Sequence, residues 1–150
     1  MTRILLLAAA CLLVAGCSDT AADTGTTTRA GVPGAASEER LPEAPEGNFT
    51  LYVSNQSFDI PAVDIRIRLD GLEAVEDTFA VEDQHNWVEF VFDLPEGTHV
   101  IEAISERGDA ELVRKFKVTA EHWAVVDYWY YPGEKKRFSF SISDTPIGFA

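Results

Sequence analysis

The residues best suited to binding lie in one short segment near the C-terminus. In a regular strand every second side chain points the same way, so a strand over residues 121–131 gives one face these residues: Trp123, Val125, Asp127, Trp129 and Tyr131. Asp127 marks this face as the outer one, because an unpaired carboxylate is costly to bury. Rings can stack on a sugar or on a partner's side chains, and the carboxylate accepts hydrogen bonds. The segment therefore predicts a ligand- or partner-binding surface.

Trp87 is expected to join this surface, because it and Val91 alternate outward on a neighbouring strand. The alternative is that a loop, or the tail formed by residues 145–149, covers the rings. Soluble domains rarely leave a large apolar patch bare. The sequence leaves both outcomes open.

Metal chemistry has weaker candidates. No two of the three histidines, His85, His99 and His122, are spaced to share one face of one element, so we expect structural roles for them. Carboxylates cluster around Phe79, where Glu76-Asp77 and Glu82-Asp83 suggest either a weak calcium site or a solvated acidic edge. The spaced oxygen ligands and fixed glycine of an EF-hand are missing, so we expect the acidic edge and no metal or cofactor.

The sequence contains no motif for nucleophilic catalysis. It lacks a Gly-x-Ser-x-Gly elbow, and no glycine-rich phosphate loop is present. Arg107-Gly108-Asp109 matches an integrin-binding tripeptide, but glycine and aspartate are also what a hairpin turn requires, and we expect a turn. We therefore predict that the protein is not an enzyme.

The charge of the chain disfavours anionic partners. Asp and Glu number 25 against 12 Lys and Arg, which gives a formal net charge of −13. Nucleic acid and anionic lipid are repelled by such a surface. We expect no nucleic-acid partner.

Several short segments have the period of two that is typical of strands. Val63, Ile65, Ile67 and Leu69 alternate with charged residues, and Asp70-Gly71 follows as a turn. Further strands are expected over residues 49–54, 78–82, 87–94, 98–105, 111–118, 121–131 and 137–143. About seven to eight antiparallel strands in about a hundred residues predict an all-β, two-sheet sandwich.

The N-terminus has the pattern of an export signal. One Arg precedes an apolar run over residues 4–14, which is too short to span a bilayer. The run ends in Val14-Ala15-Gly16-Cys17, which resembles the lipobox of bacterial lipoproteins. That resemblance implies cleavage after Gly16 and fatty acylation of Cys17. An ordinary signal peptide, cleaved near Ala15, is the alternative.

The lipobox resemblance implies a location and a domain plan. The protein would be anchored in the bacterial cell envelope, outside the cytoplasmic membrane, and Ser18 weakly favours the outer membrane. Residues 1–16 are then the signal peptide, and residues 17–47 a lipidated cysteine with a flexible tether. The tether is poor in large apolar side chains, so it cannot offset its ordering entropy by burial. Residues 48–150 form the β-sandwich.

A second resemblance covers one hairpin. The sequence Pro95-Glu96-Gly97-Thr98-His99-Val100-Ile101 resembles the turn and following strand of bacterial immunoglobulin-like and prealbumin-like surface domains. It implies an immunoglobulin-like sandwich, and such domains are mostly non-catalytic. We therefore expect a lipid-anchored envelope protein whose domain binds or assembles with another envelope component. The alternative is a carbohydrate-binding module that uses the aromatic strand face.

Overall fold

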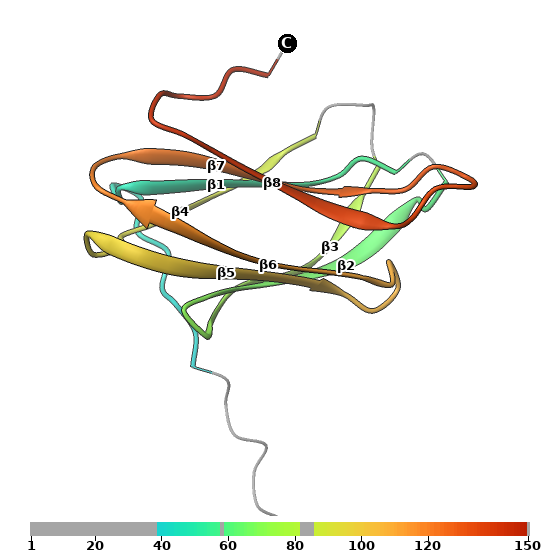
Figure 1. The fold of residues 1–150 in the computed structure, drawn as a ribbon, viewed down its shortest axis with the longest axis horizontal. Helices are drawn as coiled ribbons and strands as arrows, with labels where there is room; N and C mark the ends of the chain where they lie inside the picture. Colours follow the sequence, from blue (N-terminus) through green and yellow to red (C-terminus); the bar gives the residue numbers. More distant parts are fainter. Residues whose placement is uncertain (1–38, 58, 82–85, 150) are drawn as a thin grey trace, which may run out of the picture. The chain divides into compact units, whose positions relative to one another are not determined.

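The structure, a computed structural model, describes residues 39–57, 59–81 and 86–149. They belong to the second of two units of the chain, residues 35–150, and the first unit, residues 1–34, lies outside the described residues. The described part forms eight strands in two packed sheets of four, as the sequence predicts (Figure 1). Within it, no helix is long and apolar enough to cross a membrane.

The first sheet has the order β4-β1-β7-β8, and the second has the order β3-β2-β5-β6. Their strands are β1 (Phe49–Asn55), β4 (Val88–Phe92), β7 (His122–Trp129) and β8 (Arg137–Ser143), then β2 (Ala62–Leu69), β3 (Leu72–Ala80), β5 (Gly97–Ser105) and β6 (Ala110–Val118). The prediction of a wholly antiparallel sandwich is wrong for one pair, because β1 runs parallel to β7. Parallel neighbours need a long crossover connection, and β2 to β6 supply it.

The core lies between the inward faces of the two sheets. Strand β2 contributes every second side chain to it, as its alternating burial shows. The largest fully buried side chains are Tyr128, Phe49, Phe92, Leu51, Ile65, Ile67, Leu69 and Ile101. Burial of such side chains is the main force that holds the sheets together.

Strand β3 is longer than the sequence predicts, and it begins at Leu72 directly after the Asp70-Gly71 turn. Both turn residues have positive φ, 52° and 84°, as a two-residue hairpin turn requires. A register shift between Ile67 and Arg68 then disturbs the pairing with β2. Three successive residues, Glu73, Ala74 and Val75, are buried as a result. This run has no period of two, so the start of the strand is hidden in the sequence.

Residues 39–47, which the sequence assigns to the tether, form a strap along the edges of both sheets. Leu41 donates its N–H to Glu73 O at 2.8 Å on β3, and Ala44 donates its N–H to Val91 O at 2.8 Å on β4. Leu41 also packs against the core. Edge strands expose unpaired backbone groups that invite aggregation. The strap forms hydrogen bonds with some of the unpaired backbone groups on the edge strands β3 and β4.

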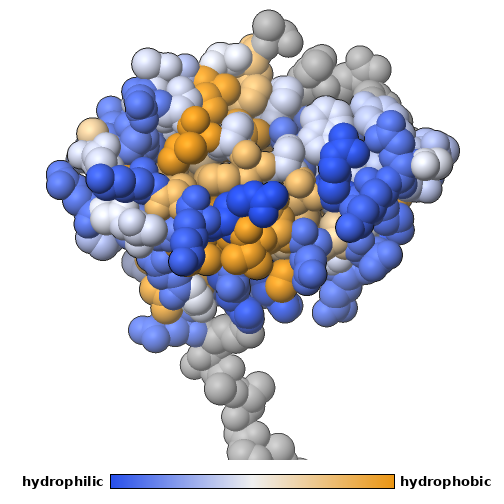
Figure 2. Space-filling view, viewed as in Figure 1, coloured by the Kyte–Doolittle hydropathy of each residue, from blue (hydrophilic) through white to orange (hydrophobic). Residues whose placement is uncertain are grey.

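The opposite side of the sandwich is bounded by edge strands β6 and β8 and is less completely closed. Phe140 is only partly buried there, and Ile142 is exposed. Figure 2 shows apolar surface over these two strands, interrupted by hydrophilic side chains. Arg114 is exposed although it lies between buried Leu112 and Phe116 on the inward side of β6. A charge at such a position discourages edge-to-edge pairing.

Candidate functional site

Strand β7 presents its predicted binding residues on the outer face of the first sheet. His122, Ala124, Val126 and Tyr128 are buried toward the core, while Trp123, Asp127 and Trp129 are half-buried on the other face. Val125 also points outward and lies outside the core cluster, yet it is only 7% exposed. The outer face therefore carries a second, smaller layer of packed side chains.

Asp127 is the polar centre of this layer. Its Oδ1 accepts hydrogen bonds from the Ser54 hydroxyl at 2.7 Å and from the Trp87 indole N–H at 2.9 Å. Ser54 pairs with Asp127 across β1 and β7, and Trp87 lies one residue before the Val88–Val53 pair. Three adjacent strands thus align these side chains in a row. Oδ2 accepts no hydrogen bond from a described residue, so it is left to interact with a ligand or solvent.

The carboxyl group of Asp127 titrates above its ordinary range. Burial raises its pKa, and the hydrogen bonds from Ser54 and Trp87 offset only part of that effect. A half-buried carboxylate beside rings is a strong acceptor for a ligand's hydroxyl or amide groups. It also fixes the orientation of the Trp87 indole.

Trp129 and Tyr131 extend the layer along β7 toward the β7–β8 loop. Their ring centroids are 6.2 Å apart, and their planes differ by 27°. The Trp129 indole N–H donates to Ser139 Oγ on β8 at 3.0 Å. Tyr131 is 37% exposed, so part of this pair faces solvent.

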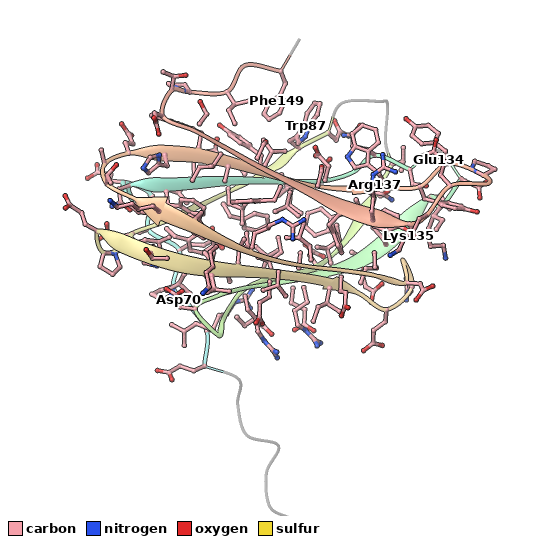
Figure 3. The ribbon with its side chains drawn as sticks, viewed as in Figure 1. Asp70, Trp87, Glu134, Lys135, Arg137 and Phe149 are labelled. Atoms are coloured by element: carbon pink, nitrogen blue, oxygen red, sulfur yellow. The ribbon has the colours of Figure 1, made fainter. Side chains whose placement is uncertain are left out.

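The C-terminal tail covers another part of the layer, which was one of the two outcomes that the sequence left open. The Phe149 ring stacks on Trp87 with centroids 3.9 Å apart and planes 15° apart. It also meets the Tyr52 ring edge-on, at 5.0 Å and 80°. Figure 3 shows Phe149 and Trp87 next to each other above the first sheet. We call the Trp87–Tyr52 pair the aromatic corner.

Tyr52 and Ser54 are members of this site that the sequence prediction missed. Both alternate outward on β1, between buried Leu51, Val53 and Asn55. Their period of two was visible in the sequence. The pairing of β1 between β4 and β7 was not, and only that pairing brings them beside Trp87 and Asp127. We call the outward side chains of this sheet, namely Tyr52, Ser54, Trp87, Trp123, Asp127, Trp129 and Tyr131, the aromatic face.

The histidines within the described residues are buried and bonded to nearby groups. His99 Nδ1 lies 2.6 Å from Asp70 Oδ2, and His99 Nε2 lies 2.8 Å from Pro95 O. His122 Nε2 accepts the Thr119 N–H at 3.2 Å. His122 Nδ1 lies 2.9 Å from Asp144 Oδ1, but without the alignment of a hydrogen bond. Each ring thus joins neighbouring segments of the fold. His85 lies outside the described residues.

The proposed acidic cluster is only partly visible. Glu76 pairs with Arg66 at 2.6 Å, and that guanidinium lowers the pKa of Glu76. Asp77 accepts the Thr78 N–H. Glu82 and Asp83 lie outside the described residues. In the described part of the chain, no group of three or more His, Cys, Asp or Glu side chains is placed to hold a metal ion.

The Arg107-Gly108-Asp109 segment forms the β5–β6 turn, as predicted. Gly108 is buried, and its carbonyl accepts the Tyr128 hydroxyl at 2.9 Å. Asp64 on β2 anchors the turn through Oδ1, which accepts from the Ser105 hydroxyl at 3.0 Å and the Arg107 N–H at 2.9 Å. Burial raises the pKa of Asp64, but these bonds and the Glu106 N–H outweigh it, so its pKa lies below the usual range.

A basic cluster in the β7–β8 loop is tied to its own neighbours. Arg137 pairs with Glu134 at 3.2 Å, and both are labelled beside Lys135 in Figure 3. Lys136 Nζ lies 5.5 Å from the centroid of the Tyr130 ring, which is a cation–π distance. Arg137 pairs with Trp129 across β7 and β8, so this residue of the cluster lies at the edge of the aromatic face.

Cys17, the predicted site of lipidation, lies outside the described residues. Comparison of the chain with protein-family models, with curated proteins and with solved structures gives no match.

Proposed function

We propose that this protein is a lipid-anchored, non-catalytic component of the bacterial cell envelope, and that its β-sandwich binds another envelope component through the aromatic face. The observation that carries the binding role is the row of side chains on three strands. There Asp127 orients Trp87 while Oδ2 accepts no hydrogen bond from a described residue. Trp and Tyr side chains are typical of interface hot spots, and the carboxylate adds a hydrogen-bond acceptor among them.

The location rests on the sequence. Residues 4–14 are apolar, and Val14-Ala15-Gly16-Cys17 resembles a lipobox. Acyl chains on Cys17 would anchor the chain in a membrane, and more than one chain is needed for stable attachment. Replacing Cys17 with Ser is expected to abolish incorporation of labelled palmitate. Undiminished labelling of the Cys17→Ser variant would refute the anchor.

The strand orders support only part of the fold resemblance. In immunoglobulin domains the first strand pairs with the second. Here β1 lies between β4 and β7, and β2 belongs to the other sheet. We therefore retain the prealbumin-like half of the resemblance as our proposal. The binding role does not depend on it, since fold alone does not determine function.

A carbohydrate-binding module is the second candidate, and one observation favours it. Trp129 and Tyr131 have nearly parallel rings, and Tyr131 is partly exposed on the same face as Asp127. A sugar ring stacks on such surfaces while a carboxylate accepts its hydroxyl groups. The partner would then be an envelope polysaccharide rather than an envelope protein.

The experiment is co-sedimentation of the Cys17→Ser chain with isolated envelopes of the source bacterium, because acyl chains on Cys17 would otherwise hold every variant on the membrane. We expect Trp129→Ala to weaken binding by at least about tenfold, the effect of losing an interface hot spot. Val113→Ala is the matched control, because Val113 is 57% exposed on the second sheet. Equal binding by Trp129→Ala and the parent chain would contradict the proposal.

Treating the envelopes with protease separates the two candidates. Loss of binding after digestion would identify a protein partner. Binding that survives digestion and is competed by soluble polysaccharide fragments would identify the carbohydrate module.

A further inference from the structure

The aromatic corner already holds a side chain from this protein's own C-terminus. Phe149 lies flat on Trp87, with 3.9 Å between ring centroids, and meets Tyr52 edge-on at 80°. Trp87 and Tyr52 are thus the two walls of the corner. Trp87 stacks face to face with the occupant, and Tyr52 contacts it in an edge-to-face arrangement. Both arrangements are favourable for aromatic pairs. The corner therefore has the geometry of a receptor for one flat aromatic ring.

The corner is rigid on the side of the sheet. The Trp87 indole N–H donates to Asp127, which also accepts from Ser54. Tyr52 lies opposite Glu89 in the pairing of β1 with β4. Its position in the centre of β1, paired on both sides, fixes its backbone. A preorganised site loses little conformational entropy when an occupant binds.

The occupant is held much less firmly than the corner. The hydrogen bonds of the tail are local, and they join Ser143 and Thr145. Among the described residues, no hydrogen bond links residues 146–149 to the sheet, and Phe149 remains 39% exposed. Each aromatic pair is worth about 1 kcal/mol beyond its area burial. With only these two pairs to hold it, we expect the tail to exchange between docked and free states.

We propose that the aromatic corner receives an aromatic side chain from an extended segment of a partner protein, and that Phe149 is its exchangeable internal occupant. This inference rests on the proposed binding role of the aromatic face and names the partner class for one part of it. The internal occupant is itself a peptide, which shows that backbone can approach the corner. A flat ring uses both walls of the corner, whereas a sugar ring has no edge-to-face partner in Tyr52.

The test uses the full chain labelled with nitrogen-15 and follows the three tryptophan indole signals by NMR. Trp87→Phe identifies the Trp87 signal by its loss. Phe149→Ala is expected to shift the Trp87 signal most, because the stacked ring is removed. Gly148→Ala is the matched control, since a methyl group at Gly148 meets no atom within 4 Å.

The added probe is the peptide Thr-Pro-Ile-Gly-Phe-Ala, which copies residues 145–150. It should return the Trp87 signal of Phe149→Ala toward its position in the parent chain, while the same peptide with Ala in place of Phe should not. It should bind the parent chain about thirtyfold more weakly, because it must displace a ring that makes two aromatic pairs worth about 1 kcal/mol each.

Three results would overturn the inference. The first is a Trp87 signal that stays in place in Phe149→Ala, and the second is a Trp87 signal that methyl β-glucoside shifts as the peptide does. A parent signal that changes with protein concentration would instead assign the corner to the tail of a second copy. If the exchange fails while Trp129→Ala still loses envelope binding, the proposed function stands and only the corner's role is lost.

Discussion

Asp127 carries a half-buried charge on the aromatic face and also fixes the orientation of the Trp87 indole. It lies among rings, and burial raises its pKa despite two hydrogen bonds. A carboxylate in this position weakens the fold at neutral pH and strengthens the orientation of Trp87. Asp64 shows the opposite balance, because hydrogen bonds from the β5–β6 turn lower its pKa.

The two aspartates should therefore respond oppositely to substitution by asparagine. Asp64→Asn removes a charged acceptor and turns an amide toward backbone donors, so we expect it to lose about 1–2 kcal/mol of stability at pH 7. Asp127→Asn keeps the acceptor for Trp87 and removes a half-buried charge, so we expect no loss or a gain at pH 7. Urea unfolding between pH 3 and pH 7 measures both.

The pH dependence follows from the signs of the shifts. The lowered pKa of Asp64 means that its contribution is present above the unfolded value, about 3.9, and is lost as the pH falls through the folded value. The raised pKa of Asp127 means that its penalty is present at neutral pH and disappears as the pH falls through the folded value. A loss at pH 7 for Asp127→Asn as large as that for Asp64→Asn would contradict this assignment.

Gly108 tests whether the tripeptide Arg107-Gly108-Asp109 is structural. A methyl group at Gly108 would lie 2.5 Å from Ser105 Oγ and 2.6 Å from Tyr128 Cε2, a ring in the core. We expect Gly108→Ala to destabilise the domain by about 1–3 kcal/mol through overpacking. Thermal unfolding measures the loss, with Gly148→Ala as a control that should change little. A stability equal to that of the parent would show that the turn relaxes freely.

At the scale of strands, the sequence predicts what depends on local alternation and misses what depends on pairing. β2 and β8 were readable from a period of two, and Asp127 identified the outer face of β7. The start of β3 was not readable, because its register shift buries three residues in succession. The parallel pairing of β1 with β7 joins distant segments and leaves no local signal.

The same distinction applies to the candidate site. The row of rings on β7 followed from the sequence, as did the possibility that residues 145–149 cover part of it. The contribution of Tyr52 and Ser54 required the position of β1 between its two neighbours. The aromatic corner, built from β1 and the residue before β4, was therefore invisible to pattern alone.

The strap formed by residues 39–47 should stabilise the domain. A methyl group at Gly47 would lie 2.1 Å from the backbone oxygen of Phe92, so the strap would have to leave β4. We expect Gly47→Ala to cost about 1–3 kcal/mol and to speed hydrogen exchange in β4. Glu43→Ala, at an exposed position in the same strap, is the control. Unchanged exchange in β4 would mean that the strap contributes nothing to the edge.

At the scale of the molecule, the two sheets have different outer surfaces. The first sheet carries the aromatic face, and the second carries charged side chains such as Asp64, Arg66 and Glu76. The chain as a whole has a net charge of −13, which favours solubility over contact with anionic surfaces. A ring-rich surface with few charges on an acidic protein is where a specific partner is expected to bind.

Site-specific photo-crosslinking in living cells tests most directly the claim that the aromatic face binds an envelope component. A crosslinking residue at Ser141, on the outer side of β8 opposite Val125, should yield a discrete adduct that disappears in the Trp129→Ala background. The same residue at Lys115, exposed on the second sheet, should yield none. Adducts from Lys115 alone, or adducts from Ser141 that survive Trp129→Ala, would contradict the claim.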